Sequence, residues 1–486
     1  MQDLWTALEQ RSRDWPALDR QSLADGIWAD YVTARFARTG DANALQFLYP
    51  YLNRSQSEGA RAHAIEVAAR VFEGVGPQAV ADLGYFTRNT ASYLRDRAVI
   101  VVGATVTGAD EDTILDVLSP YLNSPNQFTQ RLAMGALAAA AAGSGSEKIL
   151  AEIRRVAETG RARQRSLELT MAELFSGRPT EEVYGLVVRP ETVGEINTGN
   201  ERAASVLVRG ASDEWYQRVC REVIDPRLHA EPEDRKWRRQ FLRRDGIFAL
   251  TRAAGSRGME ALEKMLHLRS NRCTGYALLN RAPRCFAGAD VAANRSPLLE
   301  LLRSGDVPAQ RIAAVCLGAL VDQAEEPEAV ASLTGLCGSR NGAARAGALT
   351  GLGMAARTTC DENLRKLCLD AAEHPETATE AVHALGRIFQ GSGRSDVFED
   401  IRTKARAYRN RPVKSSHRFK PLVECYRAVG LLYQGTGSAE PMDFLLPALA
   451  PSPVQWDSYR WAAGKALVLI EFSQRTLDRA FGTKWR

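Results

Sequence analysis

The sequence has little of the material that builds metal and nucleophilic sites. It contains six histidines and eight cysteines in 486 residues, and no two cysteines form a C-x-x-C pair. Zinc-type spacing is therefore absent. A P-loop, a G-x-S-x-G elbow and an H-E-x-x-H motif are absent too. No His precedes Glu, which argues against metal oxygenases built on repeated His-Glu dipeptides. We therefore predict no catalytic residue, no metal and no cofactor.

Long hydrophobic runs are also lacking. The longest candidate, LAMGALAAAAAG from Leu132, is shorter than the about 20 residues that span a bilayer. The N-terminus carries acids and no apolar core, so we expect no secretory signal and no membrane insertion. Arg far outnumbers Lys, a bias that suggests a GC-rich bacterial genome. Cysteines inside apolar stretches such as IAAVCLGAL are expected to be buried, reduced thiols, which fits the cytoplasm.

What the sequence does have is a repeat. Ala-rich apolar segments, each opened by an arginine, begin at Arg61, Arg97, Arg131, Arg165, Arg202, Arg311 and Arg345. Related segments begin at Glu380, Glu424 and Arg460. A Leu-spaced segment such as ILDVLSPYLN or PLLELLRSG precedes each one, and Gly, Asn, Ser and Pro separate the two. The apolar residues recur at three- and four-residue spacing, which predicts about eleven antiparallel helix pairs.

One helix pair cannot bury its apolar face alone, so successive pairs must stack. In its period, helix pair and opening arginine, the chain resembles the HEAT-repeat family, in a HEAT-like or armadillo-like variant. The Asp that often precedes the second helix in that family occurs here as Asp96, before Arg97, and is mostly missing elsewhere. The resemblance implies an all-α fold: a curved α-solenoid whose inner surface is lined by the second helices.

The spacing also suggests how the chain is divided. We expect capping helices and the first repeat helix over 1–60, regular repeats over 61–225, irregular basic repeats over 226–310, regular repeats over 311–400, a basic insertion over 401–422, and the last repeats with a cap over 423–486. Tryptophans near both ends, including Trp461, are expected to close the open ends of the core; the alternative is that they form an aromatic protein-binding patch. Gly135 and Ala136 are expected where neighbouring second helices approach closely.

Two basic segments interrupt the regular spacing and are candidate sites for an anion or an acidic partner. The first contains Arg235, Lys236, Arg238, Arg239, Arg243 and Arg244. The second contains Arg402, Lys404, Arg406, Arg409, Arg411, Lys414, Arg418 and Lys420, with no acid between its ends. A solvated face is the competing interpretation for both. The arginines that open the second helices are expected to bond loop carbonyls or acids of neighbouring repeats.

These features favour a non-enzymatic scaffold that holds a partner protein in a concave groove. One alternative is a nucleic-acid-binding protein that uses segments 235–244 and 402–420. A second alternative is a helical-repeat enzyme such as a DNA glycosylase, which needs an acid and aromatic residues in a deep groove. The oligomeric state and the partner's identity do not follow from the sequence.

The second basic segment yields the first prediction. Changing Arg406, Arg409, Arg411 and Lys414 to Ser should leave the fold intact, because no predicted core position changes. The variant should elute from heparin at lower salt than the wild type, since fewer cations hold the polyanion. If the wild type is not retained even at low salt, the segment is a solvated face. Equal retention of both proteins would locate the binding elsewhere, with Arg235 to Arg244 the next segment to change.

Overall fold

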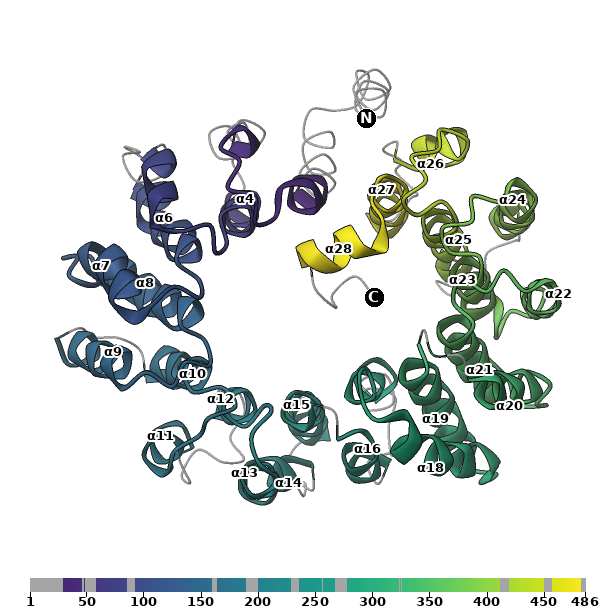
Figure 1. Ribbon diagram of the computed structural model, residues 1–486. Helices are drawn as coiled ribbons and strands as arrows, with labels where there is room; N and C mark the ends of the chain where they lie inside the picture. Colours follow the sequence, from purple (N-terminus) through teal and green to yellow (C-terminus); the bar gives the residue numbers. More distant parts are fainter. Residues whose placement is uncertain are drawn as a thin grey trace. The chain divides into compact units, whose positions relative to one another are not determined.

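The computed structural model describes residues 29–45, 48, 58–84, 92–159, 164–188, 200–228, 236–255, 257–266, 278–322, 324, 326–410, 419–449 and 457–481. All regular structure in these ranges is helical. The chain forms two compact units, one of residues 36–285 and the other of residues 1–35 and 286–486. Within each unit, helices follow one another in pairs, with the second helices on the inner side and the first helices on the outer side (Figure 1).

Residues 36–285 carry the earlier repeats. The second helices are α4 (Glu58–Val71), α6 (Ser92–Thr105), α8 (Gln127–Ala140), α10 (Gln164–Leu174), α12 (Asn200–Leu207) and α15 (Lys236–Ala254). The outer elements are η1 (Pro77–Leu83), α7 (Glu111–Leu122), α9 (Glu147–Thr159), α11 (Glu181–Val187), α13 (Asp213–Val219) with its π-helical continuation η3 (Cys220–Ile224), α14 (Asp225–Leu228) and α16 (Gly258–Leu266). A short 3-10 turn, η4 (Ala282–Cys285), ends this unit.

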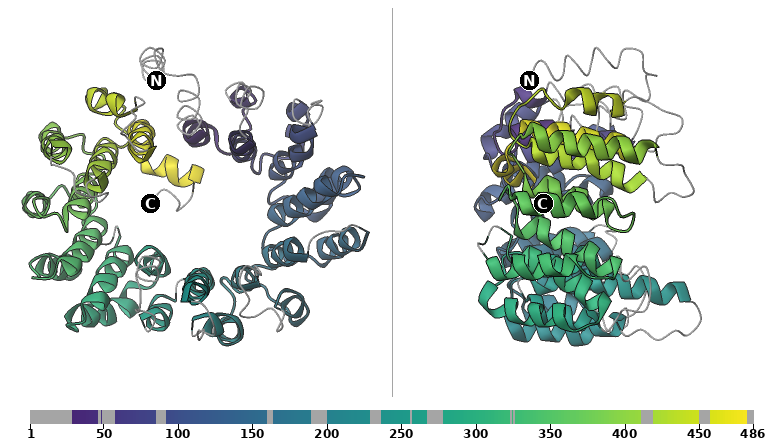
Figure 2. Two further views of the ribbon diagram at one scale, coloured as in Figure 1. Left: turned by 180° about the vertical axis from the view of Figure 1, so that it is seen from behind. Right: turned by 90° about the vertical axis from the view of Figure 1, so that its right-hand side faces the viewer.

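The other unit has the more regular pairs. Its first helices are α18 (Val291–Arg303), α20 (Pro327–Cys337), α22 (Glu362–Ala371), α24 (Ser395–Asn410) and α26 (Met442–Leu445), the last extended by η6 (Leu446–Leu449). Its second helices are α19 (Val307–Leu320), α21 (Gly342–Ala355), α23 (Ala378–Ile388), α25 (Phe419–Leu432) and α27 (Asp457–Glu471), followed by α28 (Gln474–Phe481). The side view in Figure 2 shows the green helices of this unit running roughly parallel.

This architecture is a HEAT-like α-solenoid, as predicted. The β-branched segment RAVIVVGATV lies inside α6, so the repeat register predicted its structure better than its valine content did. Helix starts follow from local sequence: Asp110, Asn126, Asp290, Asn341 and Asp361 each accept a backbone N–H of the helix that follows. Cys220, Cys285, Cys316, Cys368 and Cys425 are buried thiols as expected, whereas Cys337 and Cys360 are half-buried.

Neighbouring second helices approach closely through pairs of small residues. A Cβ placed on Gly386 would lie 2.6 Å from the Cα of Ala428 in the next helix, and one on Gly430 would lie 2.5 Å from the Cα of Ala466. Ala428 and Gly430 are two residues apart, about 200° around the helix, so they point to opposite sides. The alanine therefore faces the preceding repeat, and the glycine faces the following one.

Several of the loops that follow a second helix are hydrogen bonded to the next second helix. The N–H groups of Gly391 and Gly393, whose φ angles are 72° and 62°, donate to the carbonyls of Leu431 and Leu432 at 2.9 Å. Equivalent pairs run from Gly74 and Gly76 to Ala104 and Thr105, from Gly143 and Gly145 to Glu173 and Leu174, and from Gly435 and Gly437 to Leu469 and Ile470. In the sequence these G-x-G loops look like ordinary helix breakers. In the structure they connect neighbouring repeats, and we call such a pair of loop-to-helix hydrogen bonds a joint.

One joint is made without glycine. Thr358 and Cys360 hold φ angles of 66° and 55° and donate to the carbonyls of Arg387 and Ile388. A left-handed conformation costs a non-glycine residue about 1–2 kcal/mol. The two loop-to-helix hydrogen bonds are therefore kept even where the residues at these positions disfavour a positive φ.

The beginning and end of the chain belong to the same unit. Residues 29–36 are helical, and the ring of Tyr31 lies 5.3 Å from the ring of Phe472, which follows α27. Burial raises the pKa of Tyr31. The tryptophans expected to close the core at these ends lie outside the described residues, except for Trp461. That expectation is wrong for Trp461, whose side chain is exposed.

The close approach of second helices can be tested at two adjacent residues of α8. Ala136 lies against Gly103 of α6, because a Cβ on Gly103 would be 2.7 Å from the Ala136 Cβ. Gly135 was expected to share this contact and does not, since a Cβ there would meet nothing within 4 Å. We predict that Ala136→Leu lowers the free energy of unfolding by about 1–3 kcal/mol.

Gly135→Ala is the matched control for that substitution. It should leave the stability unchanged or raise it by up to about 1 kcal/mol, because alanine restricts the unfolded chain and favours the helix. Urea denaturation of both variants measures the difference. Equal free energies of unfolding for the wild type and Ala136→Leu would mean that α6 and α8 are not in close contact.

Candidate functional site

The first predicted basic segment lies at the start of α15. Arg235 falls outside the described residues, and Lys236, Arg238 and Arg239 lie on α15 at positions whose side chains are not described. Arg243 and Arg244 are half-buried. Arg244 forms an ion pair with Asp245 at 3.5 Å and lies 5.9 Å from the ring centroid of Phe248.

The second predicted basic segment is divided between α24, a stretch outside the described residues and the start of α25. Arg402 pairs with Glu399 at 2.7 Å. Lys404 forms an ion pair with Glu373, and its Nζ donates to the Leu369 carbonyl at 3.1 Å. Arg409 donates to the Tyr426 hydroxyl at 3.2 Å, while Arg406 and Lys420 are exposed. Arg411, Lys414 and Arg418 lie outside the described residues.

Several arginines that open second helices tie loops together, as expected from the repeat. Arg345 Nη1 donates to the Ser339 carbonyl at 2.9 Å, and Arg345 also pairs with Glu376 at 3.6 Å. Buried Arg460 donates from Nε to the Leu449 carbonyl at 3.0 Å. The guanidinium groups of Arg97 and Arg131 lie 5.0 and 5.2 Å from the ring of Phe128.

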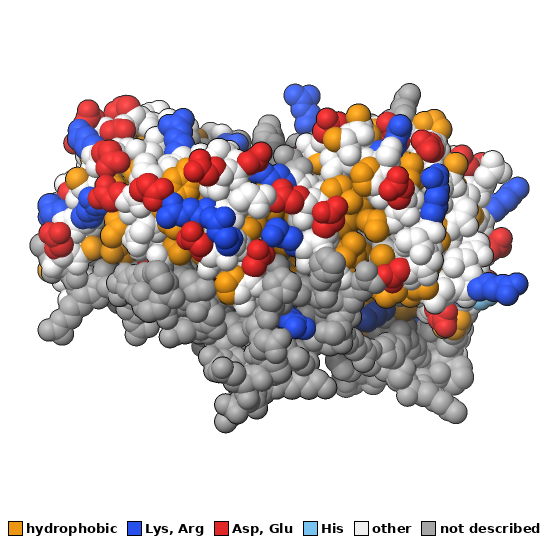
Figure 3. Space-filling model, turned by 90° about the horizontal axis from the view of Figure 1, so that it is seen from below, with side chains coloured by type: hydrophobic (Ala, Val, Ile, Leu, Met, Phe, Trp, Pro, Cys, Tyr) orange, Lys and Arg blue, Asp and Glu red, His pale blue; other side chains and the backbone are white. Residues whose placement is uncertain are grey.

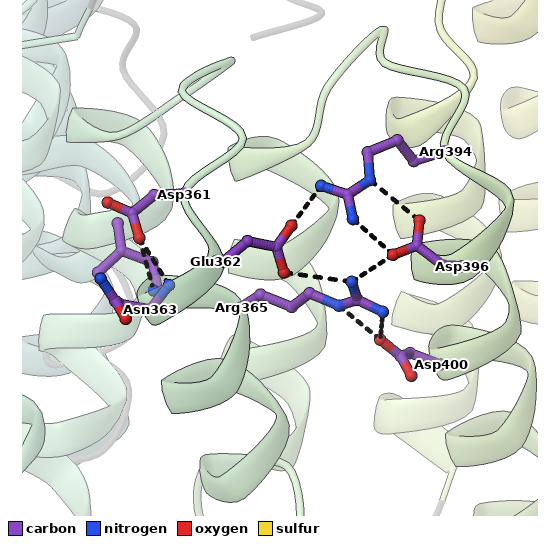
Figure 4. Close-up of polar contacts among 8 residues, drawn as sticks. Asp361, Glu362, Asn363, Arg365, Arg394, Asp396 and Asp400 are labelled. Carbon is purple, nitrogen blue, oxygen red and sulfur yellow. Dashed lines mark hydrogen bonds and ion pairs between the residues drawn. The ribbon is translucent and has the colours of Figure 1, made fainter.

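On the outer layer, basic residues are matched with acids of the adjacent helix pair. Figure 4 shows Arg365 of α22 between Asp396 and Asp400, and Arg394 between Glu362 and Asp396. The Arg365 Nε to Asp400 Oδ2 distance is 2.8 Å. The hydrogen bond from Arg394, with help from Arg365, holds the pKa of Asp396 well below its usual range. On the face of the molecule in Figure 3, acidic and basic side chains are likewise interspersed over the described surface.

The inner side of α23 carries a stripe of polar residues. Glu380, His383, Arg387 and Gln390 recur at spacings of three and four, which places them on one face. His383 Nδ1 lies 3.0 Å from Glu424 Oε2 on α25, and Arg387 Nε donates to His383 Nε2 at 3.0 Å. Because Nε2 accepts, the ring proton is assigned to Nδ1, which donates to Glu424. Both ring nitrogens are thus engaged, and this histidine has none left to abstract a substrate proton.

Glu380 on α23 and Glu424 on α25 have opposite electrostatic surroundings. Burial alone would raise the pKa of Glu424, but hydrogen bonds and charges from His383 and Arg427 outweigh it and lower that pKa. Burial raises the pKa of Glu380, whose nearest recorded ion-pair partner is Arg311 of α19 at 4.0 Å. Burial also lowers the pKa of the Arg387 guanidinium. Glu424 is therefore a favourable charge in the fold, and Glu380 is an unfavourable one.

Polar rows extend along the repeats on both sides of this stripe. Buried Arg357, after α21, pairs through Nε with Asp322, after α19, at 3.1 Å. Gln390 and Gln434, at equivalent positions after α23 and α25, and Gln474 at the start of α28 are hydrogen bonded to one another, with Gln434 Nε2 to Gln474 Oε1 at 3.1 Å. Such connected side chains fix the spacing of the second helices.

Trp461 of α27 is the residue that sequence reasoning misplaced. Its exposed fraction is 46%, and the other large hydrophobic side chain exposed among the described residues is Leu186 of outer helix α11, at 37%. Gly430 of α25 faces Ala466 of α27. Three residues earlier on each helix, Arg427 is therefore level with Ala463, between Trp461 and Lys465. The signal was available: Trp461 and Lys465 are four residues apart, opposite the buried side of α27.

We call Glu380, His383, Arg387, Glu424, Arg427, Trp461 and Lys465 the inner face of residues 286–486. Arg427 and Lys465 are exposed, and Arg427 pairs with Glu424. A cavity of about 370 Å³ lies elsewhere, between α18 and α20, and its lining includes Leu302, Arg303 and Leu336 but neither an acid nor an aromatic residue. That lining does not match the groove that a glycosylase needs.

Among the described residues, no group of three or more His, Cys, Asp or Glu side chains is arranged to hold a metal ion. None of the described helices has the length and apolar character to cross a bilayer.

Comparison with known proteins finds solved structures that are similar to this chain, but no family model and no curated protein that matches it. Among solved structures, the karyopherin Kap121p bound to the extreme C-terminus of the phosphatase Cdc14p is 12% identical, with 94% of this chain and 54% of that chain covered and a TM-score of 0.40. Yeast importin-beta, Kap95p, is 13% identical, with 95% and 70% covered and a TM-score of 0.37. The chain thus spans about half the length of Kap121p.

The opposite surroundings of the two glutamates predict opposite stability effects. Glu424→Gln should cost about 1–3 kcal/mol at pH 7, because the donors of His383 and Arg427 lose the charged, buried acceptor that they share. A lowered carboxyl pKa stabilises the fold above the unfolded value, near pH 4.3, and that stability is lost as the pH falls through the lower folded pKa. The cost should therefore persist at pH 4.5.

Glu380→Gln is the comparison variant. A raised carboxyl pKa destabilises the fold above that pKa, so removing the charge should raise the free energy of unfolding at pH 7. The gain should shrink as the pH falls and the wild-type carboxyl takes up its proton in the folded state. Urea denaturation of both variants at pH 7 and pH 4.5 measures the two trends. Destabilisation of equal size by both substitutions would contradict the assignment.

Proposed function

We propose that this protein is a non-enzymatic scaffold that binds an acidic segment of a partner protein on the inner face of residues 286–486. The observation that carries the proposal is Trp461, an exposed tryptophan on a second helix, with exposed Lys465 four residues later on α27 and exposed Arg427 in register with it on α25. Tryptophan and arginine dominate the binding energy of many protein interfaces, because they combine large apolar area with directed polar groups.

The charges of this face favour an acidic segment. Its exposed cations are Arg427 and Lys465, with Lys420 one helical turn before Glu424 on α25. Its carboxylates are less accessible: the Glu424 side chain is 11% exposed and is bonded to His383 and Arg427. An extended segment with an apolar side chain for Trp461 and acids for the cations would complement this arrangement.

The inner face is also held rigid, which supports binding rather than catalysis. Hydrogen bonds from Arg387 to His383 and from His383 to Glu424 join α23 to α25. A surface that is already ordered loses less entropy on binding. The nucleic-acid alternative receives less support from segment 402–420, because Arg402 and Lys404 are paired with Glu399 and Glu373.

The test compares the two exposed hydrophobic side chains. Tagged wild type, Trp461→Ala and Leu186→Ala are each purified from the source organism, and the proteins that accompany them are quantified by mass spectrometry. The amount of a specific partner recovered with Trp461→Ala should fall at least about ten-fold, since a hot-spot truncation of about 2 kcal/mol or more weakens the affinity about 30-fold or more. Leu186→Ala, which removes a similarly exposed side chain from an outer helix, should retain the partner.

Each variant should melt like the wild type, because neither side chain is buried. Reversing the charge of the face with Lys465→Glu should weaken the same partner without changing the fold. Equal retention of the partner by Trp461→Ala and wild type would refute the proposal. So would equal loss from Trp461→Ala and Leu186→Ala.

A further inference from the structure

A second candidate site lies within residues 36–285, on the second helices α12 and α15. Arg202 and Ser205 are three residues apart on α12, and Arg209 follows in the turn after this helix. Arg252 of α15 donates from Nη1 to the Ser205 hydroxyl at 3.2 Å, which joins the two helices. Ser205 is buried and also donates to the Arg202 carbonyl at 2.9 Å, so its position is fixed from both sides.

Two further arginines approach from the end of this unit. Arg281 lies 4.5 Å from the ring centroid of Phe248, and Arg284 follows it in η4. Phe248 and Arg252 are four residues apart, so they lie on one face of α15. We call Arg202, Arg209, Arg252, Arg281 and Arg284 the arginine cluster.

The arginine cluster lacks the acids that neutralise the outer layer. In the part of the chain that the structure describes, none of its five members forms an ion pair with a carboxylate, whereas Arg365 has three such partners and Arg394 has two. Burial and the charges of Arg202, Arg281 and Arg209 lower the pKa of Arg252, although Glu201 acts in the opposite direction. Burial, then Arg284, lowers the pKa of Arg281.

The remaining acids near this cluster do not balance its charge. Burial raises the pKa of Glu173 on α10, and Arg202 only partly offsets that effect. Asp245 is paired with Arg244. The fold therefore holds Arg252 and Arg281 partly out of water and among other guanidinium groups, where their own charges are unfavourable. A bound anion would relieve that repulsion.

We propose that the arginine cluster binds a phosphorylated side chain of a protein segment. A phosphate monoester carries a charge of about −1.5 to −2 at pH 7 and three acceptor oxygens, and guanidinium groups bind such oxygens in pairs. The half-buried Arg252 is held in place by Ser205 and is the centre of the site; Arg202 and Arg281 supply further donors.

The geometry favours a phosphorylated protein over a nucleic acid. A single-stranded nucleic acid needs a basic track along several repeats and aromatic rings open for stacking. Here the cationic residues gather over α12, α15 and η4, and neighbouring α10 presents Glu173. The ring of Phe248 is already covered by Arg281 and Arg244. A local site of this kind suits one or two phosphate groups.

The experiment uses the full-length protein and fluorescently labelled synthetic peptides of uncharged background. One peptide carries two phosphoserines, and its matched peptide carries two serines. Fluorescence anisotropy should show that the phosphorylated peptide binds about ten-fold or more tightly than its counterpart. Inorganic pyrophosphate should displace it, because the cluster recognises the phosphate groups.

Two double variants locate the binding. Arg202→Gln with Arg252→Gln should weaken the phosphopeptide about ten-fold or more. The control is Arg221→Gln with Arg340→Gln, which removes two exposed arginines outside the cluster and lowers the net charge equally; it should change the affinity less than about two-fold. Arg252→Lys keeps the charge but loses the planar fork, and it should give an intermediate loss. Thermal melting confirms that each variant is folded.

Equal affinity for the two peptides, or equal losses from the two double variants, would overturn the proposal. Tighter binding of a short single-stranded oligothymidylate than of the phosphopeptide, abolished by the same cluster variant, would replace the protein ligand with a nucleic acid. The experiment does not involve Trp461, so the proposed function and this inference can fail separately.

Discussion

Much of the stack depends on hydrogen bonds that a loop donates to the end of the next second helix, as it does after α4, α8, α21, α23 and α25. The last carbonyls of an α-helix have no partner inside the helix. Here the carbonyls of Leu431 and Leu432 are capped by the N–H groups of Gly391 and Gly393, which belong to the preceding repeat. At such a loop one repeat supplies the hydrogen-bond donors that the end of the next second helix lacks. These bonds fix the register between the two second helices. Thr358 and Cys360 accept left-handed backbone conformations to preserve that register.

A fixed register determines which residue types can lie between the helices and which must point away. The Gly386–Ala428 and Gly430–Ala466 contacts leave no room for a larger side chain on those sides. On the second helices, larger and charged side chains therefore lie on the side turned away from these contacts, where residues one repeat apart come side by side. His383 thus meets Glu424, and Gln390 meets Gln434. The same constraint sets Arg252 against Ser205. These rows of polar side chains along the second helices therefore follow from the register that the backbone hydrogen bonds set.

The sequence predicted the all-α fold, the paired helices and the structural ties of Arg345 and Arg460, because these follow from local periodicity. It did not predict the exposure of Trp461, because the rotation of the last second helix depends on its packing against α25. Nor could a count of basic residues show that Lys404 pairs with Glu373, 31 residues earlier. Partners one repeat apart are invisible until the register is known. For that reason the arginine cluster, whose members are spread over 202–284, does not stand out in the sequence as segment 402–420 does.

Charge compensation differs between the layers of this protein, and the difference bears on function. An arginine that only stabilises a solenoid is expected to have a carboxylate or carbonyl of the next repeat within reach, as Arg365 and Arg345 do. Holding unpaired guanidinium groups together and partly out of water costs free energy. Arg252 has the Ser205 hydroxyl as its recorded acceptor and other arginines around it, so stability does not account for its surroundings. We therefore explain the position of Arg252 by the anion that we propose it binds, because the negative charge of a phosphate group would offset the repulsion among these arginines.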